Sequence, residues 1–561
     1  MDYMDRFAQW CNIDDIREEL LSVQNDTEEL KSRFGAELEF GTAGMRGIMG
    51  AGTNRLNKYT VRRAAQGMAA WLSSTNLPQK AAIGYDSRHN SKLFAEVCAV
   101  AFAEKGISVY LYDRLAPTPM LSYAVRALEC GCGIVISASH NAGAYNGVKC
   151  YGPDGCQMTD EPAAIVTEQI SKIPYFIPEE KTFDAFMKDG LIHYIQQNVW
   201  EDYYNKVLSE AVQPEIIRKA NLNIVYTPLC GTGNEPVREV LGRLGTNITV
   251  VSCQEQPDGD FKTCEYPNPE TDAALFESYK VADNSPCDVI LGTDPDCDRV
   301  AIAVPNGNGH QKLSGNELGC LLMDYILRQR TLQNNIPEDA IVVRSIVSSP
   351  LADKIAVHYG VTIRAVLTGF KYIGGEILAL EEQGKEDRFI FGFEESCGYL
   401  KGTYARDKDA VIASLLICEL AASLKLEGRT ILDALQDIYN RFGQYLAYVQ
   451  SVELTGSDAM EKAARMMADL RQNVPSSIGG AKVTAVRDYK TSTATNLETG
   501  ENSTIELPKS NVLEFLLGNN GSVIVRPSGT EPKVKFYYTA VAESKEEASQ
   551  LLDRMIKQMS V

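Results

Sequence analysis

The chain has 561 residues, 44% of them hydrophobic, and exceeds the size at which one hydrophobic core keeps growing, so we expect roughly three to five domains. Its 74 acidic residues outnumber the 55 basic ones and give a net charge of −19. This charge excludes binding to nucleic acid or to an anionic membrane unless basic residues gather on one face, and the sequence contains no such basic cluster. A phosphorylated ligand would be repelled as well, so a phosphate site must be built locally from Arg, Lys and backbone N–H groups.

The sequence shows no pattern of export, membrane insertion or cysteine chemistry. Its first residues, Met1-Asp2-Tyr3-Met4-Asp5, lack the basic and apolar regions of a signal peptide. The most apolar helical run, Val411 to Leu424, contains Glu419 and is too short to span a bilayer. The cysteines form no C-x-x-C pair, which predicts neither a redox motif nor a zinc site. We therefore expect a soluble cytoplasmic protein.

Helical and short apolar strand patterns alternate along most of the chain, which predicts α/β units with mainly parallel sheets. An amphipathic helix is expected over about Asp14 to Phe34, at the start of a first unit that spans residues 1–190. The strands expected in this unit are Ala81–Tyr85, Ser108–Tyr112 and Gly133–Ser137. A second unit, residues 191–309, is expected to contain the strands Leu222–Tyr226, Ile248–Ser252 and Asp288–Leu291.

A third unit, residues 310–442, is expected to contain the strands Ala340–Ile346, Thr362–Leu367 and Arg388–Gly392. In residues 443–561 the pattern indicates a smaller α+β domain with strands Lys482–Asp488, Ser522–Arg526 and Val534–Thr539 and a closing helix Lys545–Met559. The predicted fold class is thus α/β, with three consecutive mixed α/β domains plus a smaller C-terminal α+β domain. Because open α/β sheets bind ligands at the carboxyl ends of their strands, where the polar loops of the first three units fall, we expect a central cleft between the domains.

The segment Ser137-Ala138-Ser139-His140-Asn141 follows directly on a predicted buried strand and continues to Lys149. A serine hydroxyl is a weak nucleophile unless a neighbouring base or electrophile activates it, and His140 and Lys149 are candidates for that role. The G-x-S-x-G elbow of serine hydrolases is absent, because Ser137 occupies the first glycine position. Ser, Asn and Gly are also common turn formers, so this segment alone fits a plain turn equally well.

Asp294-Pro295-Asp296-Cys297-Asp298-Arg299 places carboxylates at alternate positions after the last strand of the second unit. Such close carboxylates repel one another unless a cation neutralises them, and hard oxygen ligands suit Mg²⁺. An EF-hand is excluded, because no glycine follows Asp298 and Pro305 stands where the bidentate Glu belongs. The remaining alternative is a solvated turn, while the adjacent Arg299 is a candidate phosphate ligand.

Arg526-Pro527-Ser528-Gly529-Thr530-Glu531-Pro532-Lys533 lies between two predicted strands near the C-terminus. Its cations, hydroxyls and glycine backbone form a donor set that suits a phosphate, with a plain hairpin as the alternative. Neither G-x-x-x-x-G-K-[ST] nor G-x-G-x-x-G occurs, so no motif supports nucleotide binding. Two weaker segments, Thr368-Gly369-Phe370-Lys371 and Glu394-Glu395-Ser396-Cys397-Gly398, each follow a strand of the third unit and offer hydrogen-bond partners for sugar hydroxyls.

Together and in this order, these segments resemble the α-D-phosphohexomutase superfamily, in particular its phosphoglucomutase and phosphopentomutase-like branch. Gly41-Thr42-Ala43-Gly44-Met45-Arg46-Gly47 resembles the N-terminal signature of the family, and Gly84-Tyr85-Asp86-Ser87-Arg88 resembles its next strand-end motif. The serine, aspartate, sugar and phosphate segments follow, so that the resemblance runs from about Glu39 to Tyr537.

The resemblance implies four domains around a central cleft and a phosphorylated Ser139. It also implies Mg²⁺ held by Asp294, Asp296 and Asp298 together with an oxygen of the phosphoserine. In the family reaction the phosphoryl group passes to a sugar phosphate, and the resulting bisphosphate reorients and returns its other phosphoryl group to the serine. No net ATP is consumed.

The resemblance also implies a role for each matched residue. Arg46 would offset charge on the transferred phosphoryl group, and Lys149, His140 or Lys371 would move a proton, with Lys149 preferred to Lys371. Thr368, Gly369, Glu394 and Ser396 would contact the sugar. The phosphate that is not being transferred would be held by Arg526, Ser528, Gly529 and Thr530.

One position departs from the family pattern, which usually has proline after Ser-His-Asn where this chain has Ala142. Because proline there would stiffen the loop rather than take part in chemistry, we expect retained function with a more mobile loop.

The resemblance predicts a mutase that interconverts glucose 1-phosphate and glucose 6-phosphate, with glucose 1,6-bisphosphate as intermediate and activator. Its expected partners are small-molecule sugar phosphates, and the sequence does not indicate an oligomeric state. Pentose phosphates and mannose phosphates are the close alternative substrates, because they share hydroxyls that Glu394 and Ser396 would contact. A glucose 1,6-bisphosphate synthase is a less favoured alternative. A non-catalytic sugar-phosphate sensor is disfavoured, because it would need neither Ser139 nor the three aspartates.

Overall fold

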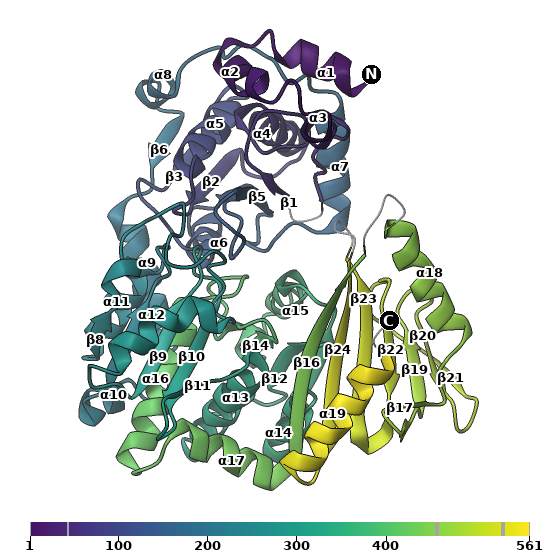
Figure 1. Cartoon of the computed structure of the whole chain (residues 1–561). Helices are drawn as coiled ribbons and strands as arrows, with labels where there is room; N and C mark the ends of the chain where they lie inside the picture. The colour runs from purple at the N-terminus through teal and green to yellow at the C-terminus, as the bar shows by residue number, and fades with distance from the viewer. Residues whose placement is uncertain (1, 42–43, 455–458, 529–532, 560–561) are drawn as a thin grey trace.

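The computed structural model describes residues 2–41, 44–454, 459–528 and 533–559. It forms four sheet-containing domains in chain order, arranged so that the first caps the second and third while the fourth stands beside the third (Figure 1). The expected fold class is confirmed. None of the helices in the described part of the chain combines the length and the hydropathy that crossing a bilayer requires.

The first domain is built on a six-stranded sheet in the order β1-β5-β4-β2-β3-β6. Its strands are β1 (Gly44–Ile48), β2 (Lys80–Tyr85), β3 (Ser108–Leu111), β4 (Cys132–Ile136), β5 (Tyr145–Tyr151) and β6 (Ile192–Tyr194). β4, β2, β3 and β6 run parallel, and β5 and β1 add an antiparallel edge. The helices of the domain are α4 (Lys58–Ser73), α5 (Ser91–Ala103), α6 (Thr118–Ala127), α7 (Asp160–Ser171) and α8 (Phe183–Lys188).

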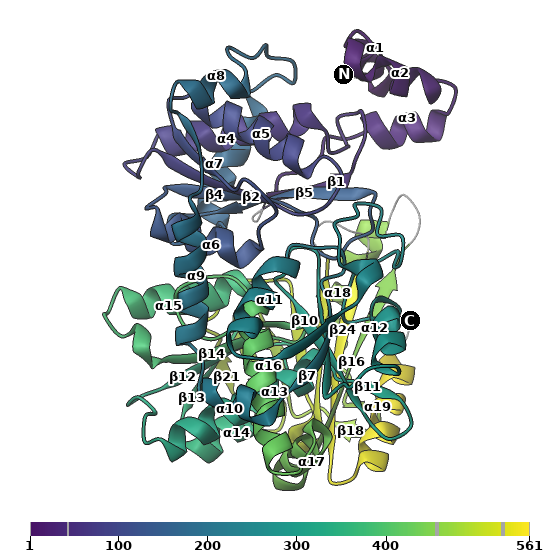
Figure 2. The same ribbon diagram turned by 90° about the vertical axis from the view of Figure 1, so that its left-hand side faces the viewer.

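Three short helices precede this sheet: α1 (Tyr3–Trp10), α2 (Asp14–Ser22) and α3 (Thr27–Phe34). The single helix expected over Asp14 to Phe34 is therefore wrong. The Asp26 side chain accepts the Glu29 N–H at 3.0 Å and is the N-cap of α3. The first N–H groups of a helix have no partner within the helix, so a capping Asp stabilises a new helix start at this point. The three helices project from the first domain (Figure 2) and pack around Trp10, which is 1% exposed.

The second domain has a five-stranded sheet in the order β11-β10-β9-β7-β8. Its strands are β7 (Asn223–Thr227), β8 (Asn247–Val250), β9 (Val289–Thr293), β10 (Val300–Pro305) and β11 (His310–Lys312). It also contains helices α9 (Gln197–Ser209), α10 (Pro214–Ala220), α11 (Asn234–Arg243), η1 (Ser252–Gln254) and α12 (Asp272–Ala282). β6 and β11 both lie just past the boundaries expected at residues 190 and 309.

The third domain has a four-stranded sheet in the order β13-β12-β14-β15. Its strands are β12 (Ile341–Ser345), β13 (Thr362–Val366), β14 (Phe389–Glu394) and β15 (Gly398–Leu400). Its helices are α13 (Gly315–Leu332), α14 (Leu351–Tyr359), α15 (Phe370–Glu381), η2 (Glu386–Arg388), α16 (Ala410–Leu426) and α17 (Ile431–Phe442). Residues Ala410 to Leu424 of α16 are all buried, because this helix packs against elements of both the second and the third domain. The two domains thus share one hydrophobic core.

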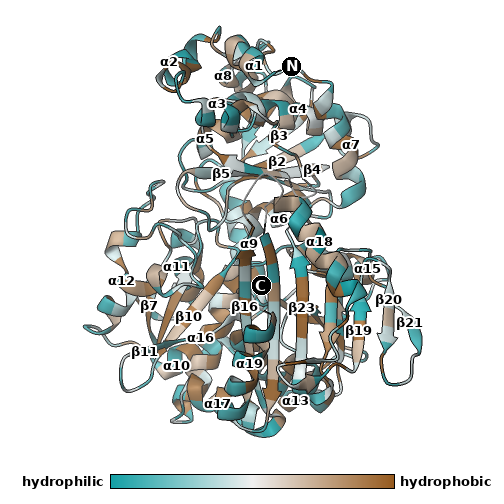
Figure 3. Ribbon diagram, turned by 45° about the vertical axis from the view of Figure 1, so that its right-hand side comes forward, coloured by the Kyte–Doolittle hydropathy of each residue, from teal (hydrophilic) through white to brown (hydrophobic). Residues whose placement is uncertain are grey.

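The fourth domain is a seven-stranded antiparallel sheet in the order β16-β24-β23-β22-β19-β20-β21. Its strands are β16 (Gln444–Glu453), β19 (Ala485–Asp488), β20 (Thr493–Asn496), β21 (Asn502–Thr504), β22 (Leu513–Leu516), β23 (Gly521–Pro527) and β24 (Lys533–Ala542). Helices α18 (Ala459–Gln472) and α19 (Lys545–Met559) pack on this sheet, with η3 (Gly518–Asn520) before β23. Figure 3 shows hydrophobic colour in the middle of the sheet, as along β23, and pale to hydrophilic colour in the edge strands β20 and β21.

Most expected strands are confirmed to within one to three residues, and the closing helix Lys545–Met559 is confirmed at both ends. The strand expected over Lys482–Asp488 is wrong as a single element. It is divided into β18 (Ala481–Lys482), which pairs with β17 (Ser477–Ile478), and β19, which joins the large sheet. The alternating sequence pattern continues through the break, so periodicity alone did not reveal that the two pieces pair with different partners.

Candidate active site

The serine and aspartate loops leave the carboxyl ends of two strands in different domains and meet. Ser139 follows β4 of the first domain, and Asp294 follows β9 of the second. Ser139 is 3% exposed, and its hydroxyl donates a hydrogen bond to Asp294 Oδ2 at 2.8 Å. Ser139 has a φ of +51°, a left-handed conformation that serine rarely adopts, and its N–H donates to Ser137 Oγ at 2.8 Å. This backbone conformation, which is sparsely populated for serine, occurs at the residue that contacts the aspartate loop.

A buried arginine binds the backbone of the serine loop. The Arg88 guanidinium donates to the carbonyl oxygens of Ser139 at 2.6 Å, Ala142 at 2.8 Å and Tyr145 at 3.0 Å, and to that of Asn141. Its Nε lies 3.3 Å from an Asp86 carboxylate oxygen, so its charge is neutralised inside the protein. Because one rigid, planar group satisfies four carbonyls, the shape of the serine loop depends on the position of Arg88.

The three carboxylates of Asp294, Asp296 and Asp298 form a buried cluster. One oxygen from each lies within 4.8 Å of the others, and all three residues are at most 2% exposed. Within the part of the chain that the structure describes, neither Asp296 Oδ1 nor Asp298 Oδ1 has a hydrogen-bond partner. Buried carboxylate oxygens left without donors are costly, and a cation placed between them would satisfy both.

The pKa of the Asp294 carboxyl also indicates that the cluster favours a bound cation. Burial together with the neighbouring Asp296 and Asp298 raises the pKa of the Asp294 carboxyl well above its ordinary value. Three hard oxygen ligands at this spacing fit a divalent cation such as Mg²⁺ or Ca²⁺, and the cluster can hold a metal ion.

Two lysines and a threonine satisfy the outer side of the cluster. Lys149 Nζ binds Asp296 Oδ2 and lies 3.1 Å from Asp298 Oδ2, and Lys408 Nζ lies 3.1 Å from the same Asp298 oxygen. Burial lowers the pKa of the Lys149 ammonium, but the two aspartates outweigh that effect and raise the pKa above its ordinary value. Thr118, at the start of α6, donates its N–H to the Asp296 carbonyl at 2.9 Å and its hydroxyl to Asp296 Oδ2 at 3.0 Å. These contacts fix the aspartate loop on the first domain.

Two further sequence-predicted residues contact the serine loop and line the cleft described below. His140 Nδ1 is 3.1 Å from Ser139 Oγ, and burial together with Arg299 and Arg46 lowers the pKa of the imidazole well below its ordinary value. Arg46, on β1, donates to the Asn141 side chain at 3.1 Å. A neutral imidazole therefore lies beside the serine hydroxyl, and a guanidinium contacts the neighbouring Asn141.

His140 and Asn141 of the serine loop and Arg299 of the aspartate loop line one cleft of about 1110 Å³, which residues of all four domains enclose. The described lining residues include seven cations, against four carboxylates. The cations are Arg46, Arg299, Lys312, Lys408, Arg526, Lys533 and Lys535, and the carboxylates are Glu270, Glu317, Glu394 and Glu395. In a chain with a net charge of −19, this local excess of positive charge is what the sequence analysis required of a phosphate site.

The third domain contributes the expected sugar loops to this cleft. Glu394 ends β14 and accepts the Gly369 N–H at 2.6 Å, which joins the two loops, and Thr368 and Ser396 also line the cavity. Glu395 accepts the Ser345 hydroxyl at 3.1 Å, while burial and the adjacent Glu394 raise the pKa of its carboxyl to about 7. Hydrogen-bonding groups thus line the side of the cleft formed by the third domain.

On the fourth domain, Arg526 and Ser528 line the cleft at the end of β23. Gly529 and Thr530 of the expected phosphate loop lie outside the described residues. The cleft is lined here by Lys533 and Lys535 of β24 as well, and the sequence analysis assigned no role to Lys535. Alternation along a strand could have indicated it, because Lys533 and Lys535 point to the same face of the sheet.

Two lysines, one proposed from the sequence and one not, lie in different surroundings. Lys371 does not line the cleft, and its ammonium pairs with Asp160 Oδ1 at 2.9 Å. Lys408, which the sequence analysis did not single out, lines the cleft and contacts the aspartate cluster. The available signal was the run Arg406-Asp407-Lys408-Asp409 directly before the apolar helix α16, since so many charges beside a buried helix need mutual partners.

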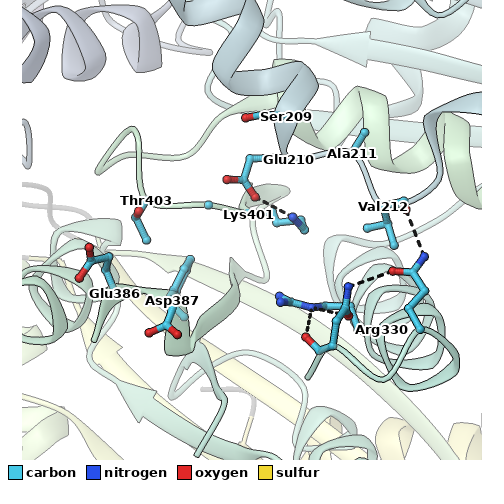
Figure 4. Close-up of a pocket in the computed structure, with 13 residues that line it drawn as sticks. Ser209, Glu210, Ala211, Val212, Arg330, Glu386, Asp387, Lys401 and Thr403 are labelled. Atoms are coloured by element: carbon cyan, nitrogen blue, oxygen red, sulfur yellow. Dashed lines mark hydrogen bonds and ion pairs between the residues drawn. The ribbon is translucent and has the colours of Figure 1, made fainter. Parts of the chain in front are cut away.

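A second hollow of about 380 Å³ lies away from the serine and aspartate loops (Figure 4). It is bounded by the end of α9, the end of α13, η2 and the loop after β15. Figure 4 shows the Lys401 ammonium pointing to Glu210, at 2.6 Å. Arg330, Glu386 and Asp387 also line the hollow, so its charge is mixed rather than positive.

Comparison with known sequences agrees with this arrangement. Residues 37–175, 201–307, 314–442 and 470–558 match, in order, the sequence models of phosphoglucomutase/phosphomannomutase alpha/beta/alpha domains I, II and III and of the C-terminal domain. The chain is 38% identical over 513 residues to a phosphoglucomutase of Staphylococcus epidermidis, covering 91% of this chain and 92% of that protein.

Solved structures show the same fold at lower identity. Parafusin, a phosphoglucomutase from Paramecium in an open form, aligns with a TM-score of 0.70 and 17% identity, covering 93% of this chain and 95% of that one. The N-acetylphosphoglucosamine mutase of Aspergillus fumigatus, solved in complex with GlcNAc-6P and magnesium, aligns with a TM-score of 0.52 and 14% identity over 93% and 95% of the two chains. With all four family domains present in order, the chain belongs to the phosphoglucomutase/phosphomannomutase family and is an enzyme of the mutase type.

Proposed function

We propose that this enzyme interconverts glucose 1-phosphate and glucose 6-phosphate through a phosphorylated Ser139. The observation that carries the proposal is the 2.8 Å hydrogen bond from Ser139 Oγ to Asp294, inside a cluster of three carboxylates at the edge of the four-domain cleft. Ser139 in the first domain would carry the phosphoryl group that is transferred, while the cations of the fourth domain bind a second phosphate. The phosphoglucomutase of Staphylococcus epidermidis, with 38% identity, supports glucose phosphates as the substrates.

The proposed transfer has a simple balance of bonds and protons. The bond between Ser139 Oγ and phosphorus forms as the bond between phosphorus and a sugar oxygen breaks, and the reverse step returns the group to the other sugar hydroxyl. The serine proton leaves as the phosphoserine forms, and the released sugar oxygen gains one. We propose that His140, whose Nδ1 lies 3.1 Å from Ser139 Oγ, takes the serine proton.

The lysines proposed from the sequence have different surroundings. Lys149 contacts two carboxylates of the cluster, which supports charge neutralisation as its main role. Lys371 is held by Asp160 outside the cleft and is the less favoured proton carrier. Arg46, beside Asn141, is the proposed partner of the transferred phosphoryl group.

Mg²⁺ is the ion we propose for Asp294, Asp296 and Asp298, with an oxygen of phosphorylated Ser139 as a further ligand. The two buried carboxylate oxygens without hydrogen-bond partners support this assignment. Bound there, Mg²⁺ would withdraw negative charge from the phosphoryl group during transfer. The magnesium in the fungal mutase structure, which has the same fold, is consistent with the choice.

The remaining assignments concern the sugar phosphate. We propose that Arg526 and Ser528, with Gly529 and Thr530, hold the phosphate that is not being transferred, and that Arg299 assists them. Glu394 and Ser396 would bind sugar hydroxyls beside Thr368 and Gly369, in either orientation of a glucose 1,6-bisphosphate intermediate. The described members of this set line the cleft from three different domains, which supports a ligand with a phosphate at each end; they are Arg299, Thr368, Gly369, Glu394, Ser396, Arg526 and Ser528. We expect the enzyme to act on these small molecules in the cytoplasm.

The test is to incubate the purified chain with glucose 1,6-bisphosphate and Mg²⁺ and to follow its intact mass. We expect an increase of one phosphoryl group, located at Ser139 by peptide mapping, together with conversion of glucose 1-phosphate to glucose 6-phosphate. A chain that acquires no phosphate and converts no sugar phosphate would refute the proposal. Comparison of kcat/KM for glucose, mannose and ribose 1-phosphates then decides between glucose and the two alternative sugars.

A further inference from the structure

A segment of the second domain packs against the serine loop of the first. It lies in the long connection between η1 and α12, and Asp258 to Cys264 form two successive turns closed by the hydrogen bonds Phe261 N to Asp258 O at 3.1 Å and Cys264 N to Phe261 O at 2.8 Å. We call these residues the buttress segment. Long connections without regular structure are uncommon in compact domains unless they have a function.

The buttress segment contacts the loops around Ser139 at two glycines. A Cβ added at Gly143, in the serine loop, would lie 2.7 Å from the Gly259 carbonyl oxygen. A Cβ added at Gly259 would lie 2.7 Å from the His89 backbone nitrogen, in the loop that carries Arg88. Backbone therefore packs directly on backbone, and Asp260 closes the edge of the contact with a 2.6 Å interaction with the His89 ring. Such close packing leaves little freedom for relative movement.

The side chain at the centre of this contact is Phe261. It is 2% exposed, and its ring centroid lies 4.9 Å from the Arg88 guanidinium carbon, in a cation–π arrangement. Phe261 also has a φ of +49°, a conformation that costs energy for a bulky residue and persists only where surrounding contacts hold it. The strained backbone places the ring on the guanidinium that binds the carbonyl oxygens of Ser139, Asn141, Ala142 and Tyr145.

We propose that Phe261 is a positioning residue: by packing on Arg88, it holds the serine loop so that Ser139 Oγ stays within reach of Asp294. The second domain then supplies both Asp294, which the serine contacts, and Phe261, which fixes the position of Arg88 under the carbonyl oxygens of the serine loop. The inference rests on the proposed phosphoserine chemistry and adds a residue outside the cleft lining to it. Since the sugar is held by the third and fourth domains, loss of the ring should slow phosphoryl transfer and leave sugar binding unchanged.

Phe261→Leu tests this, because it keeps an apolar side chain but removes the ring from Arg88. We expect kcat to fall about tenfold, in the range that a desolvated cation–π contact supports, with KM for glucose 1-phosphate within about twofold of the parent. Phosphorylation of Ser139 by glucose 1,6-bisphosphate should slow by the same factor but still reach one group per chain. Phe261→Tyr should restore both rates, because it restores the ring at the same backbone position.

The matched control is Phe276→Leu. Phe276 lies in the same domain, is 54% exposed and has Lys280 over its ring at 4.3 Å, so it loses a cation–π pair that does not touch the serine loop. Its kcat should equal that of the parent. A second variant, Gly259→Ala, pushes the buttress segment away from His89 and should lower kcat in the same way, whereas Gly242→Ala, where the added Cβ meets nothing within 4 Å, should not.

Two outcomes would overturn the inference. In the first, Phe261→Leu turns over at the parental rate. In the second, a smaller fraction of the Phe261→Leu chains becomes phosphorylated at Ser139, but kcat per phosphorylated chain equals that of the parent. That behaviour is expected of a residue needed only for folding. Failure of the proposed function looks different, because then the parent itself neither accepts a phosphoryl group nor converts glucose 1-phosphate.

Discussion

The Ser139 hydroxyl donates a 2.8 Å hydrogen bond to Asp294, so the serine loop of the first domain and the aspartate cluster of the second form one buried unit. The contact depends on the alignment of two domains, which also touch at Thr118, bonded to Asp296, and at the buttress segment, packed on His89 and Gly143. Side chains far apart in the sequence therefore meet at one position, where the proposed phosphoryl transfer would take place.

Ser139→Ala should abolish mutase turnover, a loss of at least about a thousandfold, while the protein stays folded, because the hydroxyl that carries the phosphoryl group is gone. The measurement is kcat with glucose 1-phosphate and Mg²⁺, with thermal unfolding as the check on folding. Ser171→Ala, at the exposed end of α7, is the control and should be unaffected. Substantial activity in Ser139→Ala would show that another residue carries the phosphoryl group.

Asp296→Asn should sharply raise the Mg²⁺ concentration needed for half-maximal activity, because it removes one ligand charge from the cluster and leaves Lys149 without one of its two carboxylate partners. Direct metal titration of the purified protein checks the effect independently of turnover. Asp553→Asn, on the exposed side of α19, should behave like the parent. An unchanged magnesium requirement in Asp296→Asn would remove Asp296 from the metal site.

Lys408→Met and Lys371→Met compare the contribution to turnover of a lysine that lines the cleft with that of a lysine paired to Asp160. We expect Lys408→Met to lower kcat by more than about tenfold, because it leaves Asp298 and Asp407 without their shared cation in a buried site. Lys371→Met should change kcat by less than about threefold, since its partner Asp160 is 75% exposed and such pairs contribute little. The reverse order would make Lys371 the proton carrier.

Glu419→Gln should change how stability depends on pH. Glu419 is completely buried in α16 and accepts the Val212 and Gln213 N–H groups, and burial raises the pKa of its carboxyl to about 7. Because this pKa lies above the value in the unfolded chain, the folded protein binds the proton more tightly. The stabilisation is complete below about pH 4.5 and is lost as pH rises through 7, by at most about 3 kcal/mol.

The measurement is the thermal midpoint of unfolding between pH 5 and pH 8 for the parent and for Glu419→Gln. Relative to the variant, the parent should lose stability as pH rises across this range, whereas Glu427→Gln, at the half-exposed end of the same helix, should follow the parent. Parallel curves for the parent and Glu419→Gln would contradict the assignment.

Ala142→Pro should leave turnover largely intact. Among the described hydrogen bonds, the Ala142 backbone contributes its carbonyl oxygen, to Arg88 and to the Tyr145 N–H, and proline keeps that carbonyl. Stiffening the loop would then act mainly on its freedom in the unfolded chain. Loss of phosphoserine formation in this variant, measured by intact mass, would show that the loop must move during the reaction.

Local patterns accounted for the fold where short-range chemistry decides it. Buried apolar runs such as Gly133–Ser137 and Asp288–Leu291 predicted β4 and β9, and the closing helix was predicted at both ends. The helix expected over Asp14 to Phe34 failed because one side-chain cap at Asp26 interrupts a pattern that periodicity reads as continuous. The sequence pattern also missed the break within Lys482–Asp488. The two pieces pair with different strands, and such pairing is decided by partners elsewhere in the chain.

By itself, the sequence determined which residues can carry the chemistry: a serine beside His140, three alternating aspartates, and an Arg526 loop, each placed after a strand. Tertiary structure alone decided which of them meet. It brought Lys408 to Asp298 and kept Lys371 at Asp160. It also packed Phe261 on Arg88 and Arg88 on the Ser139 carbonyl, and residue spacing does not specify these partners. The physical reason is that residue type and strand position set what a side chain can do, whereas the burial and pairing of charges depend on contacts between domains.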